Sequence, residues 1–205
     1  MKMSRSSRRF FLSALWLAAT VVVGAGFPQA AYAEDPVVHA LTIKAEIAGK
    51  VIEFYHSDLD HYFITANPAE AAAIDSGSAG PGWKRTGLDF SSGGVTSVCR
   101  FYGSVSPGPN SHFYTADASE CQALKDIQAR TPATEKRWNF EGHDFTIETA
   151  VNGSCVSGQR PVFRAYNNGA ARGVDSNHRI SADVAAIEEV LGRGWLFEGV
   201  VMCSP

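Results

Sequence analysis

This chain of 205 residues contains Cys99-Arg100-Phe101-Tyr102, then Asn110-Ser111-His112-Phe113-Tyr114-Thr115-Ala116-Asp117-Ala118-Ser119-Glu120, then Trp138-Asn139-Phe140-Glu141-Gly142-His143-Asp144-Phe145. The same pattern occurs three times along the chain, in variant form. Its opening piece is Ile52-Glu53-Phe54-Tyr55 in the first copy and Phe163-Arg164-Ala165-Tyr166 in the third. Its closing piece keeps the spacing Trp-x-x-x-Gly-x-x-Phe/Met in every copy, starting at Trp83, Trp138 or Trp195. A fixed spacing that recurs three times indicates a repeat architecture.

Each copy predicts two short strands, then a helix, then a third strand. The opening strand alternates apolar with polar residues, and the second strand is expected at 62–65, 112–115 and 178–181. A helix follows at once, because Asn67 with Glu70, and Asp117 with Glu120, form N-cap arrangements. The inner glycine of the last strand fits a β-bulge.

These elements predict a mainly β protein with short helices, an α+β fold of three strand-strand-helix-strand repeats at about 51–92, 98–147 and 161–203. One repeat alone cannot bury its apolar face, whereas three repeats packed around a pseudo-threefold axis can. We therefore expect residues 51–205 to form a closed antiparallel pseudo-threefold assembly, because closure removes exposed strand edges. Trefoil-like hairpins and small propeller-like blades both fit the pattern. A lead-in strand is expected within residues 34–50, at 40–47.

The second copy carries, in order, the motifs Arg-Phe-Tyr, His-Phe-Tyr-Thr-Ala, Ala-Ser-Glu and Trp-x-Phe-Glu-Gly. This ordered set resembles an exported bacterial repeat family, domain of unknown function 5648, over roughly Val51 to Pro205. The resemblance implies an extracytoplasmic accessory or binding module, found alone or appended to secreted hydrolases, and it brings no catalytic residues. The third copy departs from the family pattern, with Arg179 where an aromatic residue is expected and Ala165 in place of Phe.

Residues 1–33 are predicted to be a cleaved export signal of the twin-arginine type. A basic start contains Ser7-Arg8-Arg9-Phe10-Phe11-Leu12, an apolar run extends to about Phe27, and Ala31-Tyr32-Ala33 forms a small-x-small cleavage site. An uncleaved membrane anchor is the alternative. We expect the mature chain to begin near Glu34, to lie in the periplasm or outside the cell, and to contain no membrane span.

Charge and motifs argue against several classes of function. The chain has 18 Lys and Arg against 21 Asp and Glu, and loss of Lys2, Arg5, Arg8 and Arg9 with the signal leaves 14 against 21, a net charge of about −7. That balance disfavours nucleic-acid binding, which needs clustered Lys and Arg. The sequence contains no Gly-x-Ser-x-Gly elbow, no His-Glu-x-x-His and no Gly-rich phosphate loop. We therefore assign no catalytic residue, expect no cofactor, and expect a monomer.

All four cysteines follow the signal, and an even count in an exported chain predicts two disulfides. Alignment of the copies selects the pairs. Cys99 and Cys121 take positions that are apolar in the other copies, one on the opening strand and one on the helix. A core contact would thus become a bond, which predicts Cys99–Cys121 and leaves Cys155–Cys203. A Cys/His metal site is disfavoured because no C-x-x-C spacing occurs.

The polar residues just before the second strand, with the tyrosine of the opening strand, are the leading ligand-binding candidates. Aromatic rings stack on the apolar faces of sugars, and short polar groups bind the hydroxyls. The structural alternative is that each His or Tyr satisfies a helix cap or the repeat's own Glu. The candidates are Tyr55, His61, Tyr62, Tyr102, Asn110, His112, Tyr166, Asn177 and His178.

Other side chains suggest further chemistry. His56, Asp58, Asp60 and His61 could hold a cation in a loop, although aspartates are also favoured in solvated turns. Arginines inside apolar strands, such as Arg100, are expected to form ion pairs within their own repeat that hold strand to helix. A catalytic pair among the recurring glutamates is the alternative. The three repeat tryptophans are expected in the core.

Together these observations favour an exported, non-catalytic binding or accessory module whose partner is a glycan or another cell-envelope component, such as an envelope protein. A secreted hydrolase with an unrecognised site is one alternative, and a protein–protein interaction or inhibitor module is another. The sequence alone leaves catalysis undecided, because catalytic groups are assembled in space and need no local motif.

Overall fold

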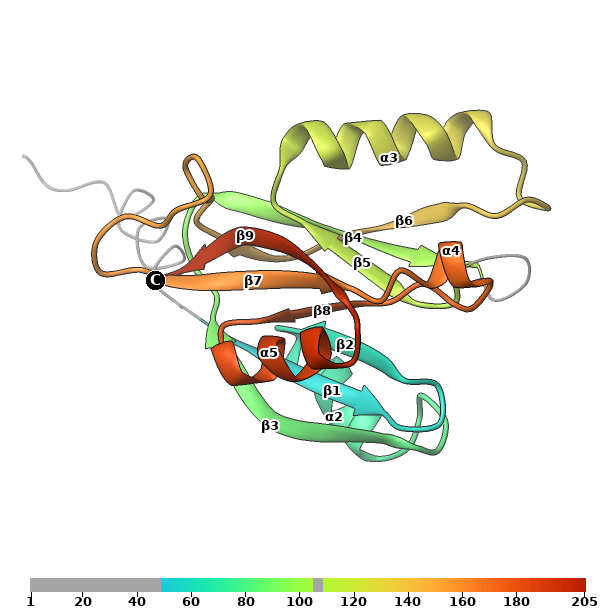
Figure 1. The fold of residues 1–205 in the computed structure, drawn as a ribbon, viewed down its shortest axis with the longest axis horizontal. Helices are drawn as coiled ribbons and strands as arrows, with labels where there is room; N and C mark the ends of the chain where they lie inside the picture. Colours follow the sequence, from blue (N-terminus) through green and yellow to red (C-terminus); the bar gives the residue numbers. More distant parts are fainter. Residues whose placement is uncertain (1–48, 105–108) are drawn as a thin grey trace, which may run out of the picture. The chain divides into compact units, whose positions relative to one another are not determined.

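Each repeat forms its own three-stranded antiparallel sheet, with the opening strand in the middle (Figure 1). The sheet orders are β2-β1-β3, β5-β4-β6 and β8-β7-β9. The strands are β1 (Lys50–His56), β2 (His61–Thr65), β3 (Trp83–Ser91), β4 (Thr96–Gly103), β5 (His112–Thr115), β6 (Trp138–Ile147), β7 (Arg160–Tyr166), β8 (His178–Ser181) and β9 (Leu196–Ser204). The predicted second strands are therefore confirmed to within one residue.

A computed structural model describes residues 49–104 and 109–205. No sheet in this part closes on itself, so the expected closed assembly is not confirmed, and the protein is mainly β with short helices. Within the described residues, no helix is long and apolar enough to cross a membrane. The predicted signal at 1–33 and the lead-in strand predicted at 40–47 lie outside the described residues.

A helix follows the second strand of every repeat: α2 (Pro68–Asp75), α3 (Ala118–Arg130) and α5 (Val184–Gly192). Their N-caps are Asn67, Asp117 and Asp183, whose side chains accept hydrogen bonds from backbone N–H groups of the first turn. A further helix, α4 (Gly169–Arg172), lies between the first two strands of the third repeat, where no helix is expected from the sequence. The Asn167 side chain accepts from the backbone N–H of Gly169, and its N–H donates to the Asp175 carbonyl, which folds this loop into one helical turn.

The inner glycines of the last strands fit the predicted bulges. Gly87, Gly142 and Gly199 have φ of 87°, 130° and 105°, and each lies close to a register shift between the opening and last strands. A side chain is strained at such positive φ, which accounts for glycine in all three copies.

The main apolar core draws residues from all three repeats, including Val51, Val98 and Val162, which are each fully buried. A single repeat therefore does not bury its own apolar face. Only one of the three tryptophans meets the core expectation. Trp195 is buried, whereas Trp83 and Trp138 are half-buried and face cavities, so the expectation is wrong for these two.

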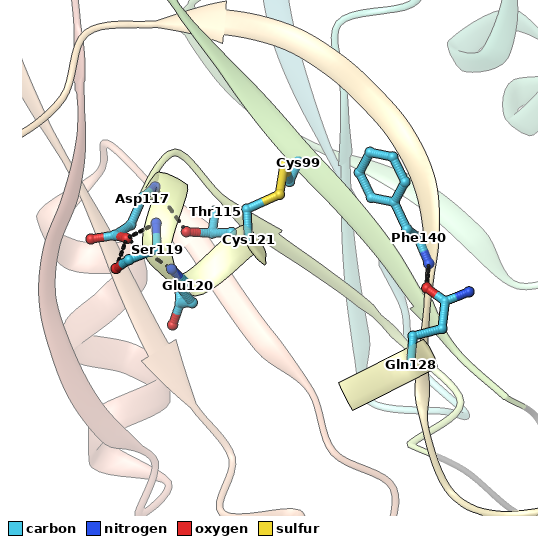
Figure 2. The surroundings of a disulfide bond; sticks show 8 residues. All are labelled: Cys99, Thr115, Asp117, Ser119, Glu120, Cys121, Gln128 and Phe140. Atoms are coloured by element: carbon cyan, nitrogen blue, oxygen red, sulfur yellow. Dashed lines mark hydrogen bonds between the residues drawn. A yellow bond between two sulfur atoms is a disulfide. The ribbon is translucent and has the colours of Figure 1, made fainter. Parts of the chain in front are cut away.

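Both predicted disulfides are present. Cys99–Cys121 joins β4 to the first turn of α3, next to the Asp117 cap (Figure 2). Cys155–Cys203 ties the segment before β7 to the end of β9. Each disulfide therefore joins a strand to a segment that is not paired with that strand in a sheet.

The repeats are held to one another by arginines of the opening strands. Arg100 forms ion pairs with Glu70 of the preceding repeat, at 2.9 Å, and with Glu141 of its own repeat, at 3.0 Å. The guanidinium of Arg100 also lies over the ring of Phe63, 5.9 Å from its centroid. We expected strand-to-helix ion pairs inside each repeat. The helix glutamate instead comes from the neighbouring repeat, because the arginine points across the junction.

The junction between the second and third repeats repeats these contacts at equivalent positions. Arg164 bonds Glu120 of the second repeat at 3.0 Å and Glu198 of its own repeat at 2.7 Å, and its guanidinium lies over the Phe113 ring. An arginine that is nearly buried thus meets two carboxylates and an aromatic face, which compensates the loss of its hydration.

The junction between the third and first repeats has the same contact with the charges exchanged. Glu53 takes the arginine position of the opening strand, and Arg179 takes the position of Phe63. Glu53 and Arg179 are 3% and 5% exposed, and the carboxylate of one lies 3.0 Å from the guanidinium of the other. The former glutamate positions change with them, to Ala186 on α5 and Thr86 on β3. Arg179 therefore reaches the Ala186 carbonyl without a steric or charge conflict.

Removal of either disulfide should destabilise the protein in proportion to the logarithm of the chain length it closes. Cys155→Ala/Cys203→Ala opens a separation of 48 residues and should cost about 4 kcal/mol, and Cys99→Ala/Cys121→Ala opens 22 residues and should cost about 3 kcal/mol. Urea unfolding of the two double variants measures both values. A larger loss for the shorter separation would contradict the chain-entropy account.

Glu53→Gln should lower the free energy of unfolding by about 3 kcal/mol, because it leaves the buried guanidinium of Arg179 without its main partner. The loss is at the low end for a buried pair because Glu189 still contacts Arg179. Glu53→Met/Arg179→Met removes both charges and should recover most of that loss. Asp89→Asn, which breaks the exposed pair with Lys50, is the control and should cost under about 1 kcal/mol. Equal losses for Glu53→Gln and the control would show that the buried pair does not hold this junction.

Candidate functional site

A cavity of about 550 Å³ opens at the junction of the first and second repeats; we call it the first cavity. The first repeat contributes the rings of Phe63 and Trp83, and the second contributes those of Tyr102 and His112. The polar side chains that face it include Asn110, Glu70, Glu141 and Arg100. Aromatic rings beside a few convergent polar groups are typical of a small-molecule site.

The tip before β5 sets the aromatic side of this cavity. Asn110 has φ of 48°, a left-handed conformation that Asn tolerates, and Asp60 has the same conformation in the first repeat. The Tyr102 hydroxyl donates to Asn110 Oδ1 at 3.1 Å, and the Tyr102 and His112 rings lie 5.0 Å apart. The ring of Phe63 meets His112 edge-on at 4.7 Å. The rings are thus fixed before any ligand binds.

Carboxylates exceed cations at the first cavity. Glu70 and Glu141 both line it, and Asp144, which is 5% exposed and outside the lining, lies 3.7 Å from Arg100. The hydrogen bond from His112, with Arg100 beside it, lowers the pKa of Glu141. Burial raises the pKa of Asp144 to about 6, and its Oδ2 is buried without a hydrogen-bond partner. Of these two neighbouring carboxyl groups, Glu141 is therefore easier to ionise than usual and Asp144 is harder to ionise.

A second cavity, of about 320 Å³, lies at the junction of the second and third repeats. Its lining residues Phe113, Trp138, Tyr166 and His178 occupy the positions of Phe63, Trp83, Tyr102 and His112. Burial lowers the pKa of His178 to about 3, so this imidazole is neutral near neutral pH, and it stacks on Tyr166 at 4.8 Å. The second cavity is a smaller version of the first.

At the third junction a side chain occupies the equivalent place. Arg193, which follows α5, lies over the Trp195 ring at 5.3 Å and bonds Asp60 at 2.8 Å and Glu189 at 3.0 Å. It also donates to the Tyr62 hydroxyl at 3.1 Å. Burial raises the pKa of Tyr62 to about 12, so the phenol stays protonated there.

The sequence-predicted binding residues divide among these three places. Tyr166 and His178 line the second cavity. Tyr55 donates to Asp60 and packs on Tyr62 at 4.6 Å, so it belongs to the third junction. Asn177 is fully buried and donates to the Asp60 carbonyl at 2.7 Å, which links the third repeat to the first. The lining of the first cavity includes the other five candidates, of which Tyr62 also packs at the third junction: His61, Tyr62, Tyr102, Asn110 and His112.

The predicted cation loop is not gathered into a site. His56 Nε2 lies 2.8 Å from the Pro81 carbonyl, and the Asp60 carboxylate accepts from Tyr55 and Arg193. Across 49–104 and 109–205, no group of three or more His, Cys, Asp or Glu is placed to hold a metal ion. Asp58 and His61 therefore have no metal partners among the described residues.

Sequence reasoning missed the half of the site that comes from the neighbouring repeat. Trp83, Glu70 and Glu141 were interpreted as core or as internal ion pairs, yet all three line the first cavity. Their recurrence at fixed positions was visible in the sequence. The missing information was that the glutamate of one helix faces the arginine of the following repeat.

Asp144 should make the stability of the protein fall with rising pH. Its folded pKa of about 6 lies above the ordinary value of 3.8, so the unfolded chain releases this proton first as pH rises. The contribution of Asp144 is thus complete below the ordinary value and is lost as pH rises through about 6. Relative to Asp144→Asn, the wild-type protein should lose free energy of unfolding across this window, measured by urea unfolding. A constant difference between the two proteins would contradict this assignment, and Asp89→Asn serves as the exposed control.

The family model described as "Domain of unknown function (DUF5648)" matches residues 30–129, which include the first repeat and the second up to the end of α3. No curated protein and no solved structure matches the chain. The third repeat lies beyond the matched stretch and shares its element order and sheet topology with the first two. The family model that matches residues 30–129 is therefore that of the family that the repeated motifs resemble.

Proposed function

We propose that this protein is an exported, non-catalytic binding module that recognises a glycan of the cell envelope through the first cavity. The observation that carries this proposal is the convergence of five predicted binding residues on one 550 Å³ cavity, beside the rings of Phe63 and Trp83. Rings supply stacking surfaces for sugars, and Asn110 and His112 supply short polar groups for hydroxyls. The two disulfides are compatible with export to an oxidising compartment, and we expect a monomer there.

We also place the three repeats around a pseudo-threefold axis. Equivalent positions meet at all three junctions: Phe63 with His112, Phe113 with His178, and Arg179 with Tyr62. A cyclic arrangement accounts for this recurrence without strand pairing between repeats. It also accounts for three related sites that differ in size and occupancy.

A hydrolase is the second candidate, favoured by Glu141, which lines the first cavity, and by Asp144, which lies beside the same arginine, Arg100. Glu141 has a lowered pKa, whereas that of Asp144 is raised to about 6, and separated pKa values of this kind suit a general base and a general acid. Turnover of a glycoside panel that disappears in Glu141→Gln would favour this candidate over a binding module.

Tyr102→Ala should weaken binding to the glycan at least about tenfold, because it removes one stacking ring worth roughly 1 kcal/mol and the hydrogen bond that holds Asn110. A glycan array identifies the ligand, and isothermal titration calorimetry measures its affinity. Tyr166→Ala alters the same position of the third repeat and should leave this affinity within about twofold, because Tyr166 lines the second cavity and not the first.

The melting temperature of Tyr102→Ala separates lost binding from lost folding. A folded Tyr102→Ala protein that binds as tightly as the wild type would refute the first cavity as the site. The absence of any glycan ligand for the wild-type protein would refute the glycan proposal itself.

A further inference from the structure

The third junction shows which kind of group fits on the tryptophan of this fold. The guanidinium of Arg193 lies over Trp195, within 3.0 Å of two carboxylates, Asp60 and Glu189. Cations are attracted to the faces of aromatic rings, and charge-assisted hydrogen bonds to carboxylates strengthen that attraction. The chain thus places one of its own cations where the other two junctions leave a cavity.

The first cavity has an equivalent residue at each position of this site, but its carboxylates lie at different positions. Trp83 takes the position of Trp195 and His112 that of Tyr62, while Asn110 and Ala73 replace the two acids. The carboxylates of the first cavity stand elsewhere, on Glu70 and Glu141. Both sites therefore combine a tryptophan face with two carboxylates.

The carboxylates of the first cavity are more accessible than the arginine between them. The side chains of Glu70 and Glu141 are 29% and 32% exposed, against 19% for Arg100. Asp144 is a third carboxylate beside the same guanidinium. Two carboxylates that line the cavity therefore share one guanidinium and are more exposed than it is, whereas Asp144 is only 5% exposed and does not line the cavity.

Fewer carboxylates line the second cavity: Glu120 lines it, whereas both Glu70 and Glu141 line the first. At the same junction Arg164 forms ion pairs with Glu120 and Glu198, and Val201 stands at the position of Asp144. Its imidazole, His178, is neutral, and its volume is about 320 Å³ against about 550 Å³. The first cavity is therefore the better site for a cation.

We infer that the ligand of the first cavity carries a cationic nitrogen, and that it is a glycan with free amino groups, such as an oligomer of de-acetylated amino sugars. This inference rests on the proposed glycan-binding function. The pyranose rings stack on the aromatic side chains, and the ammonium groups bind Glu141 and Glu70. Acetylation of the amine removes the charge and should weaken binding.

Two oligosaccharides of equal length test this inference on the unaltered protein. A glucosamine oligomer, titrated at a pH where its amines are protonated, should bind at least about tenfold more tightly than the matching N-acetylglucosamine oligomer. The preference should shrink as salt is added, because both carboxylates are partly exposed. Equal affinities would overturn the cationic ligand and leave glycan binding intact.

Glu141→Gln should weaken the glucosamine oligomer about tenfold and change the N-acetylated oligomer less than about twofold. Arg100 keeps Glu70 and Asp144 as partners, so the junction stays paired. Glu198→Gln is the matched control, since it removes the same strand glutamate from the third repeat. Equal losses in the two variants would overturn the assignment to the first cavity.

Oligolysine distinguishes the source of the cation. Binding of oligolysine as tight as that of the glucosamine oligomer, with the same loss in Glu141→Gln, would overturn the glycan in favour of a basic peptide. A neutral glycan that binds while neither amino oligomer does, and that is lost in Tyr102→Ala, would overturn the cationic ligand alone. Failure of every glycan would overturn the proposed function as well.

Discussion

The packing of the repeats depends on a nearly buried arginine at the junction between two of them. Its guanidinium loses hydration when the repeats pack, and it is compensated only if carboxylates approach from both sides. At Arg164 these come from the preceding helix, through Glu120, and from the last strand of its own repeat, through Glu198. Where the opening strand carries Glu53 instead, the facing position becomes Arg179 and both glutamate positions lose their acids. Four positions thus change together, as expected if one charge cannot be buried without the others.

The same junctions create the candidate sites. Each one brings a tryptophan and a helix of one repeat to the polar tip of the next, which leaves a cavity that neither repeat could form alone. The three junctions then differ: the first has a cavity of about 550 Å³, the second has one of about 320 Å³, and at the third Arg193 fills the equivalent place. The charges that hold the repeats together also line the open cavity, so stability and ligand preference are set by one group of side chains.

The repeated pattern was sufficient to predict the strands, the helices and their caps, and the glycine bulges, because these depend on residues near one another in the chain. It also predicted Cys99–Cys121, because a cysteine pair that replaces two equivalent apolar residues reports a core contact. The short helix α4 was missed, since Asn168 and Gly169 signal a turn and only the Asn167 side chain organises it as a helix. Trp83 was assigned to the core because an alignment cannot tell an inward ring from one beside a cavity.

The sequence by itself determined the order of the three strands and of the helix after the second strand in each repeat, and the disulfide pairs, since spacing and alternation are local properties that survive without coordinates. Only the tertiary structure decided which repeat supplies each partner of Arg100, and that Trp83 and Glu141 face the same space as Tyr102. Those relations join residues of different repeats, and nothing in a repeat's own pattern records which neighbour it will meet. The physical reason is that burial of a charge is settled by the packing of whole repeats, whereas a strand or a helix cap is settled by a few adjacent residues.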